Sequence, residues 1–421
     1  MRILKDINEL LSEGIIDQNT AGSIKNYYFN KKNSGEGKQN LVFGIFGALL
    51  AGLGIILILA HNWDDLSRGV KTFFSFLPLI AGQILCGYSL LKNKSISWKE
   101  AGSSFLAIAT GACISLISQI YHIPGNLSSF LFTWSLLILP LVYIMRSRIV
   151  SLIYIILITW YACESFYFSN SPDFYFYLIL LAAIFPYYIA LIRKNPGSNF
   201  AVFHHWLIAG SISICLGIIP GNSEEIVLLC YVLLFGIMNR IAFSDKFSPL
   251  NIFKNAYFII SSVSLIAIFL TLSFDFFWEF LRKENYQLKE IITSPEIIPA
   301  LILFLILILM QFFKFGKNLP LGPLPIFFTL IFFAGYYLTG MQWMMNLLIL
   351  YTGLKIMQKG FLIDHLGILN IGIFILLILI ICRFFDTQLS FVLRGLIFLF
   401  AGTGFFIANY FILKRRKLNE Q

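Results

Sequence analysis

Long apolar segments alternate with short polar ones along almost the whole chain. A helix needs about 20 apolar residues to cross the hydrocarbon core of a bilayer. The pattern therefore predicts an all-α, polytopic transmembrane helix bundle of about 14 spans, with 12–14 compatible with the shorter segments. The spans are expected at residues 41–60, 72–91, 102–120, 129–145, 149–168, 174–192, 201–219, 225–239, 250–272, 296–315, 325–339, 341–358, 366–385 and 390–413.

Composition supports the same class. The chain has 421 residues, of which 58% are hydrophobic and 12% charged. Soluble domains carry about 25% charged residues, so this chain holds about half the usual share. So much apolar surface requires lipid as its solvent, and the bilayer is the expected partner.

The first 40 residues follow a different pattern and do not resemble a signal peptide. Ile3, Ile7 and Leu10 fall on one helical face, Gly14 suits a helix end, and Asp17 suits the N-cap of a second helix. We expect a cytoplasmic amphipathic helical hairpin and linker over residues 1–40. It would lie on the membrane or dock a protein partner, and the first interpretation is favoured because apolar helix faces are common.

Lys and Arg are distributed unequally between the two sides that these spans define. If the N-terminus is cytoplasmic, seven fall outside, which leaves 24 of the 31 inside; the seven are Arg68, Lys71, Arg282, Lys283, Lys289, Arg383 and Arg394. This asymmetry predicts a multi-pass membrane protein with both termini cytoplasmic. Because the net charge of +10 lies in short loops, it indicates topology, and no nucleic-acid partner is expected.

Polar side chains gather on the predicted outer side. The segment "AHNWDDLSRGVKT" precedes the second span, "QIYHIPGN" follows the third, and "DTQLSFVLRG" precedes the last. Ionisable groups at membrane-span ends indicate functional sites. The candidate polar site comprises His61, Asn62, Asp64, Asp65, Arg68, Tyr121, His122, Asp386 and Arg394.

Helix capping accounts for part of this set. Asp64 or Asp65 would cap the second span, and Arg68 lies four residues after Asp64, the spacing of an ion pair. His61 and His122 are left over. Together with the aspartates they would bind a metal or pass protons in a polar cavity. No recognised ligand spacing occurs, so we assign neither a metal nor a cofactor.

Other residues have structural interpretations. The small-residue faces of spans 41–60 and 102–120 predict positions inside the bundle, whereas span 296–315 should face lipid. His204 and His205 are expected at the cytoplasmic interface, and Asn346 within a span as an interhelical hydrogen-bond partner. The six cysteines lie in apolar segments and suit neither a disulfide framework nor a zinc site.

Two segments carry a family resemblance. "GIILILAHNWDDLSRGVKTFFSFLPLIAGQ" and "SQIYHIPGNLSSFLFTWSLLILPLVYIMRS" resemble the predicted bacterial membrane proteins of domain-of-unknown-function family 2157. The resemblance covers about residues 1–148, and the chain end is similar to the tails of longer members. It implies an integral inner-membrane protein and supplies no activity. The expected divisions are the segment 1–40, a family-like four-span unit 41–148, a further bundle 149–413 and a basic tail 414–421.

Three functions fit these observations. The number of spans and the outer polar site favour a transporter or flippase-like carrier. A membrane-embedded enzyme acting on a lipid or envelope precursor would use His61, His122 and the aspartates as acid and base groups. A non-catalytic envelope assembly or sensing protein would dock partners through residues 1–40. No Walker A, G-x-S-x-G or kinase motif occurs, which disfavours ATP-driven pumping and standard soluble catalysis.

Overall fold

The structure is a computed structural model of the chain. It divides into two compact units, residues 1–77 and residues 78–421, and each is described by itself. The described residues are 7, 10, 11, 13–24, 63–168, 174–218, 223–247, 249–283, 294–313, 315, 323–362, 366–384, 390–396, 398–400 and 402–404.

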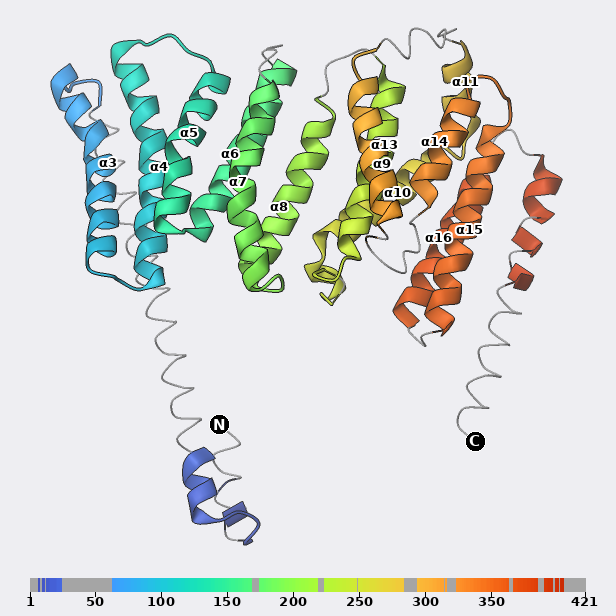
Figure 1. Ribbon diagram of the computed structural model, residues 1–421, viewed down its shortest axis with the longest axis horizontal. Helices are drawn as coiled ribbons and strands as arrows, with labels where there is room; N and C mark the ends of the chain where they lie inside the picture. The colour runs from blue at the N-terminus through green and yellow to red at the C-terminus, as the bar shows by residue number, and fades with distance from the viewer. Residues whose placement is uncertain are drawn as a thin grey trace. The chain divides into compact units, whose positions relative to one another are not determined.

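Every regular element among the described residues is helical, which confirms the all-α prediction. Figure 1 shows the helices of the second unit running alternately up and down. The α-helices are α3 (Arg68–Leu91), α4 (Ile96–Tyr121), α5 (Leu127–Met145), α6 (Arg148–Cys163), α7 (Phe174–Lys194), α8 (Asn199–Leu216), α9 (Glu224–Ala242), α10 (Ala256–Thr271), α11 (Asp275–Lys283), α13 (Ile297–Phe312), α14 (Leu324–Ala334), α15 (Met341–Leu362) and α16 (Leu366–Phe384). A π-helical turn, Glu164–Phe168, extends α6, and a 3-10 turn, Ile252–Lys254, precedes α10.

Eight helices of the described residues are long and apolar enough to cross a membrane: α3 to α9 and α16. Their positions agree with the predicted spans to within a few residues, because long apolar runs fix where a spanning helix lies. The predicted first span, 41–60, lies outside the described residues, as does much of the last. The apolar helices fit an integral membrane protein.

The region between α10 and α15 departs from simple spans. Helices α13 and α14 have 16 and 11 residues. At 1.5 Å per residue, they reach only about 24 Å and about 16 Å, short of the roughly 30 Å hydrocarbon core. The apolar run predicted as span 325–339 is helical only to Ala334, where Gly335 forms the C-cap. Composition alone does not reveal such an early end.

Helix α9 is the most enclosed of the eight. In its most apolar stretch 78% of residues are buried, against 22–50% in the others. It packs against α8, α10, α13 and α14. A helix that is apolar on all sides belongs in a protein interior, so this span, one of the shortest in the sequence, forms the centre of its half of the unit.

The prediction that span 102–120 lies inside the bundle holds for its small-residue face, where Ala107 and Gly111 are buried. Phe105 and Ile108 of the same helix are exposed. The small-residue face receives one indole from α5: the Nε1–H of Trp134 donates to the Ala107 carbonyl at 2.8 Å. A Cβ on Gly111 would lie 2.5 Å from that ring. The small residues therefore make room for a side chain, since close approach does not require a central position. Helix α13 does expose most of its side chains, as predicted.

The described part of residues 1–24 agrees with the local sequence signals. Gly14 adopts a left-handed φ of 68°, as a helix-ending glycine does. Residues 18–24 are helical, and the Thr20 N–H donates to the Asp17 carboxylate at 3.2 Å. Hydrogen bonding with Thr20 lowers the pKa of Asp17 below its ordinary value. Asp17 is therefore the N-cap that the sequence predicted.

Helices α15 and α16 pack at backbone distance. A Cβ on Gly372 would lie 2.6 Å from the Met357 backbone nitrogen and 2.8 Å from the Gly353 carbonyl oxygen. In lipid, where apolar side chains gain nothing by leaving the solvent, close van der Waals packing is what holds such a helix pair together.

Replacing Gly372 with alanine should therefore destabilise the protein. We expect Gly372→Ala to cost about 1–3 kcal/mol, because the rigid backbone of α15 must move. Gly210→Ala in α8 is the matched control: a Cβ added at Gly210 would meet nothing within 4 Å, and alanine favours a helix by about 0.5–1 kcal/mol. Thermal unfolding in detergent measures both. Equal melting temperatures would show that the α15–α16 contact is looser than described.

Candidate functional site

The sequence-predicted outer residues are only partly described. His61, Asn62 and Asp386 lie outside the described residues. Asp64 and Asp65 are exposed in a turn that precedes α3. Because α3 begins at Arg68, the residue before the helix is Ser67, and the capping prediction for the two aspartates is wrong.

The predicted ion pair between Asp64 and Arg68 is also wrong: no such contact occurs among the described residues. The i,i+4 spacing acts only inside a helix, and Asp64 precedes this one. Instead, the Lys71 ammonium donates to the backbone carbonyl of Asp64 at 3.5 Å and lies 5.9 Å from the ring centre of Trp63. These contacts fold the turn back onto the first helical turn.

Tyr121 and His122 end α4 in the second unit. Tyr121 is 52% exposed. His122 is the C-cap with φ 52° and ψ 41°, and its backbone N–H donates to the Gln119 carbonyl at 3.4 Å. Histidine is among the residues that tolerate the left-handed region, so its position has a local structural reason. Whether His122 meets Asp64 and Asp65 stays a prediction, because they belong to different units.

Arg394 lies near the start of the helical residues 391–396, with its guanidinium 5.1 Å from the ring centre of Phe391. Its predicted association with Asp386 is untested. No group of three or more His, Cys, Asp or Glu side chains within the described ranges has a metal-binding arrangement.

His204 and His205 are fully buried in the second turn of α8, and their place at the cytoplasmic interface stays a prediction. The His204 Nε2 lies 2.7 Å from the Ser151 hydroxyl on α6. The His205 Nδ1 lies 2.7 Å from the Tyr188 hydroxyl on α7, which in turn lies 2.7 Å from the Tyr257 hydroxyl on α10. Hydrogen bonds across helices satisfy polar groups that lipid cannot, so these imidazoles join four helices.

A second polar cluster lies where the chain breaks between α10 and α11. Together the two helices are long and apolar enough to cross a membrane, but they are bent by 71° at the residues between them. We name the cluster the broken-helix site, and it comprises Ser273, Asp275, Arg282, Gln342, Asn346 and Arg383. The residues come from the α10–α11 link, α11, α15 and α16.

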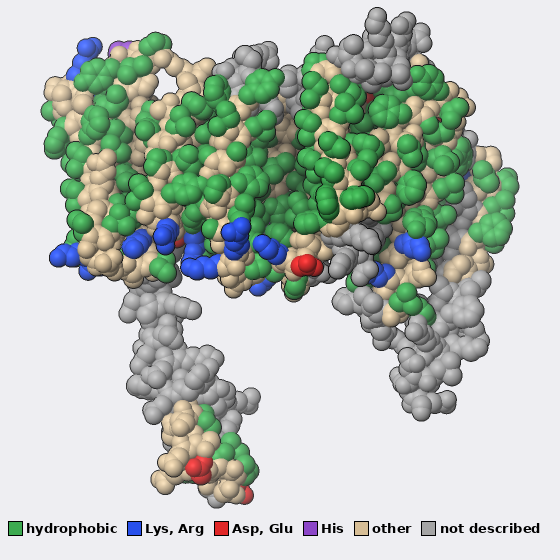
Figure 2. All heavy atoms as spheres, viewed as in Figure 1, with side chains coloured by type: hydrophobic (Ala, Val, Ile, Leu, Met, Phe, Trp, Pro, Cys, Tyr) green, Lys and Arg blue, Asp and Glu red, His purple; other side chains and the backbone are tan. Residues whose placement is uncertain are grey.

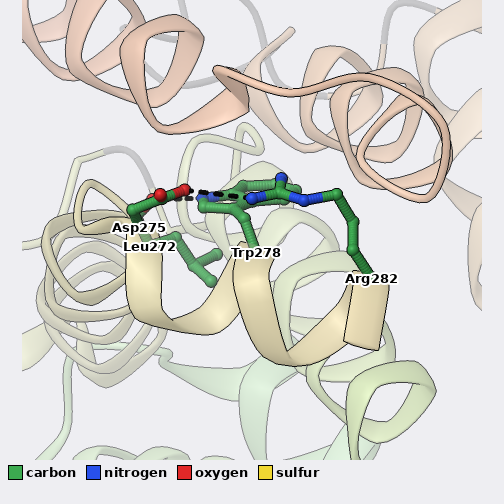
Figure 3. Close-up of polar contacts among 4 residues, drawn as sticks. All are labelled: Leu272, Asp275, Trp278 and Arg282. Carbon is green, nitrogen blue, oxygen red and sulfur yellow. Dashed lines mark hydrogen bonds and ion pairs between the residues drawn. The ribbon is translucent and has the colours of Figure 1, made fainter. Parts of the chain in front are cut away.

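A buried tryptophan holds the bend in place. The Nε1–H of Trp278 donates to the Leu272 carbonyl at 2.8 Å, which satisfies a backbone group freed by the break (Figure 3). Trp278 is completely buried, and its ring lies so close to Gly335 of α14 that a Cβ there would collide with it. Helix α11 is therefore anchored in the protein interior.

Asp275, Trp278 and Arg282 lie on the same side of α11, as Figure 3 shows. The Arg282 guanidinium and the Asp275 carboxylate form an ion pair at 3.4 Å. Their side chains are 22% and 14% exposed, so the pair is only partly hydrated. A partly buried charge pair is weakly screened by salt.

Ser273 at the break accepts hydrogen bonds from two other helices. The Arg383 guanidinium of α16 donates to its hydroxyl at 3.0 Å, and the Asn346 amide of α15 donates to its carbonyl at 3.2 Å. Arg383 is 6% exposed and lies 4.6 Å from the ring centre of Phe274. Asn346 is thus the interhelical partner that the sequence predicted.

The site keeps hydrogen-bonding capacity that the described residues do not use. The Arg282 Nη1, the Gln342 Oε1 and the Asn346 Oδ1 are buried without a hydrogen-bond partner among them. Buried polar atoms are nearly always satisfied, by protein, water or ligand. One donor and two acceptors are therefore available to a polar molecule.

The sequence pointed to Asn346 and Arg383 but could not bring them together. Their separation along the chain is large, and Ser273 is a common residue in a loop of no distinctive pattern. The one signal was the interruption of apolar sequence after Leu272, which is typical of a broken span.

Comparison with known families agrees with the resemblance noted in the sequence. Residues 8–151 match the profile of the family DUF2157, described as "Predicted membrane protein". No curated protein and no solved structure gives a significant match to the chain.

Replacing Ser273 with alanine tests the cluster. Ser273→Ala removes the acceptor for Arg383 and should destabilise the protein by about 1.5–3 kcal/mol, the range for hydrogen bonds to charged groups. Ser213→Ala is the control, because the Ser213 hydroxyl donates to the Ala209 carbonyl of its own helix at 2.7 Å and meets another helix only through the Met238 sulfur, a weak acceptor at 4.0 Å. Melting temperatures in detergent give the comparison. Equal losses would contradict a bond between Arg383 and Ser273.

Proposed function

We propose that the protein is a multi-pass membrane carrier whose substrate binds at the broken-helix site. The observation that carries this proposal is the 71° break between α10 and α11 next to buried charges. Backbone that leaves the helical state at membrane depth is tolerated where it lines a cavity or lies buried in protein. Secondary transporters bind substrates at discontinuous helices of this kind.

The charges support a carrier rather than a purely structural bundle. Arginine within a membrane protein is costly and marks ligand pathways more often than packing positions. Arg383 comes from the end of a span and Arg282 from α11, and one carboxylate, Asp275, pairs with Arg282. Guanidinium groups bind carboxylate and phosphate oxygens, so Arg282 and Arg383 favour a polar solute that carries negative charge.

The same proposal includes the topology. The chain would cross the bacterial inner membrane about 14 times, with both termini and an N-terminal helical hairpin on the cytoplasmic side. The connections α3–α4, α5–α6 and α7–α8 lie at one end of the helices, and Figure 2 shows Lys and Arg gathered along that edge. Helix α11, which carries Asp275 and Arg282, lies toward the other end of these helices, the end at which α4 finishes with Tyr121 (Figure 1).

Alternating access tests the carrier. With the six native cysteines replaced by alanine, Asn346→Cys should react with a membrane-impermeant maleimide both in intact cells and in inside-out vesicles, because a carrier exposes its site to each side in turn. Leu350→Cys is the control, since this α15 side chain is exposed on the apolar surface and should face lipid.

Labelling of Asn346→Cys from one side only would contradict a carrier and favour a closed pocket of the kind an enzyme uses. Absence of labelling from both sides, with the protein present at normal level, would leave the cluster a packing element.

Reporter fusions test the topology. Fusing green fluorescent protein after Gln421 should give fluorescent cells, and fusing alkaline phosphatase there should give no activity, because the Lys/Arg-rich side is expected to be cytoplasmic. Active phosphatase at Gln421 would show that the C-terminus is not cytoplasmic and would contradict the proposed topology. A fusion within the Pro124–Asn126 connection should behave in the opposite way.

A further inference from the structure

A cavity of about 850 Å³ opens among α4, α5, α6 and α7 in the second unit. It lies at the ends of these helices where α5 passes into α6, at the Lys/Arg-rich edge (Figure 2). Its volume falls within the range of small-molecule sites, about 300–1,000 Å³. Neither the broken-helix site nor the predicted outer residues contribute to it.

The cavity is strongly basic. Five cationic side chains line it, against a single acid, Glu100; the five are Lys99, Arg146, Arg148, Arg193 and Lys194. Among the described residues none of the five forms an ion pair, although Arg148 stacks on Phe200 with its guanidinium 5.3 Å from the ring centre. Cations brought together without carboxylate partners repel one another, so an anion in the cavity would stabilise the group.

The carboxylate of Glu100 already accepts hydrogen bonds from the start of α6. The donors are the Ser147 hydroxyl at 2.5 Å, the Arg148 N–H at 2.9 Å and the Ile149 N–H at 3.1 Å. Glu100 is buried and sits on the positive N-terminal end of α6. Glu100 therefore fixes the floor of the cavity and leaves the five cations to a ligand.

Arg146 occupies a backbone position that arginine rarely takes. It is the C-cap of α5 with φ 51° and ψ 39°, where glycine or asparagine is usual. The Tyr187 hydroxyl donates to its carbonyl at 3.3 Å and holds the turn. A strained position that still carries a long cationic side chain indicates a use for that side chain.

Apolar side chains border the basic cavity. Ile96 of α4 and Pro186 and Leu191 of α7 are among its lining residues. Ile96 is 64% exposed, and an exposed apolar side chain on a helix that crosses a bilayer faces lipid. A molecule in the cavity can thus have a charged part among the arginines and an apolar part beside these side chains.

We propose that this cavity binds a phosphate-bearing anion, with the headgroup of an acidic lipid as the source that the apolar border favours. Arginine binds phosphate oxygens through two parallel hydrogen bonds, and the guanidinium groups of Arg146, Arg148 and Arg193 provide this geometry. Basic pockets between membrane helices on the cytoplasmic side are suited to anionic headgroups. Free inorganic phosphate presents the same chemistry without the acyl chains.

Native mass spectrometry of the full-length protein in detergent tests the proposal. The probes are phosphatidylglycerol, phosphatidylcholine and inorganic phosphate, each added separately. The double variant Arg146→Gln/Arg193→Gln should bind phosphatidylglycerol at least about tenfold more weakly than the unchanged protein, because two phosphate contacts are lost. Phosphatidylcholine binding should not change.

The control variant Lys92→Gln/Lys355→Gln removes the same charge from exposed residues outside the cavity. It should bind phosphatidylglycerol as the unchanged protein does. Size-exclusion profiles show whether each variant folds, and if the double variant aggregates, Arg193→Gln alone replaces it, since Arg193 is exposed at the end of α7.

Selective loss of phosphatidylglycerol binding in the cavity variant supports a lipid headgroup site. Loss of inorganic phosphate binding, without a preference for phosphatidylglycerol in the unchanged protein, supports the same phosphate site with a soluble ligand. Equal phosphatidylglycerol and phosphate binding by the cavity and control variants overturns the proposal, because the attraction would then be a property of the whole basic edge.

Discussion

Lipid offers no hydrogen bonds, and this constraint governs the architecture. Every backbone N–H and C=O at membrane depth must find its partner within the protein, so the chain forms helices wherever it is apolar. Polar side chains inside the bundle obey the same requirement. Fully buried His204 pairs with Ser151 across two helices, and buried Arg240 of α9 donates to Gln311 of α13.

The break between α10 and α11 leaves backbone groups without their helical hydrogen-bond partners. The structure compensates for the break with side chains: the Trp278 indole satisfies the Leu272 carbonyl, and Arg383 and Asn346 both donate to Ser273. The compensation is incomplete, since Arg282, Gln342 and Asn346 each keep a buried polar atom without a hydrogen-bond partner among the described residues. A helix broken only for packing would gain from apolar residues here, and this is why we propose that a polar ligand binds at the break.

The two polar regions of the second unit differ in kind. The broken-helix site is formed at a bend and keeps unsatisfied polar atoms, whereas the basic cavity has a volume of about 850 Å³ and is lined in part by apolar side chains such as Ile96. The basic cavity lies at the side where α5 and α7 end, which is also the side where α10 begins. The broken-helix site follows the far end of α10, so the two regions lie toward opposite ends of the helices. A carrier could use both regions. The basic cavity would bind acidic headgroups at one leaflet, and the broken-helix site would bind the solute.

Apolar run length and the placement of Lys and Arg determined the fold class, most helix positions and the membrane assignment, because burial in lipid depends on local sequence. Local signals also identified Asp17 as an N-cap and Asn346 as an interhelical partner. Only the tertiary structure decided that α14 ends early against Trp278, that α9 is central, and that His204 and His205 are buried. It also assembled Arg146 with Arg193, and Ser273 with Arg383, from distant segments. Those contacts depend on which helix faces meet, and an apolar pattern that is similar all round each helix carries no record of that choice.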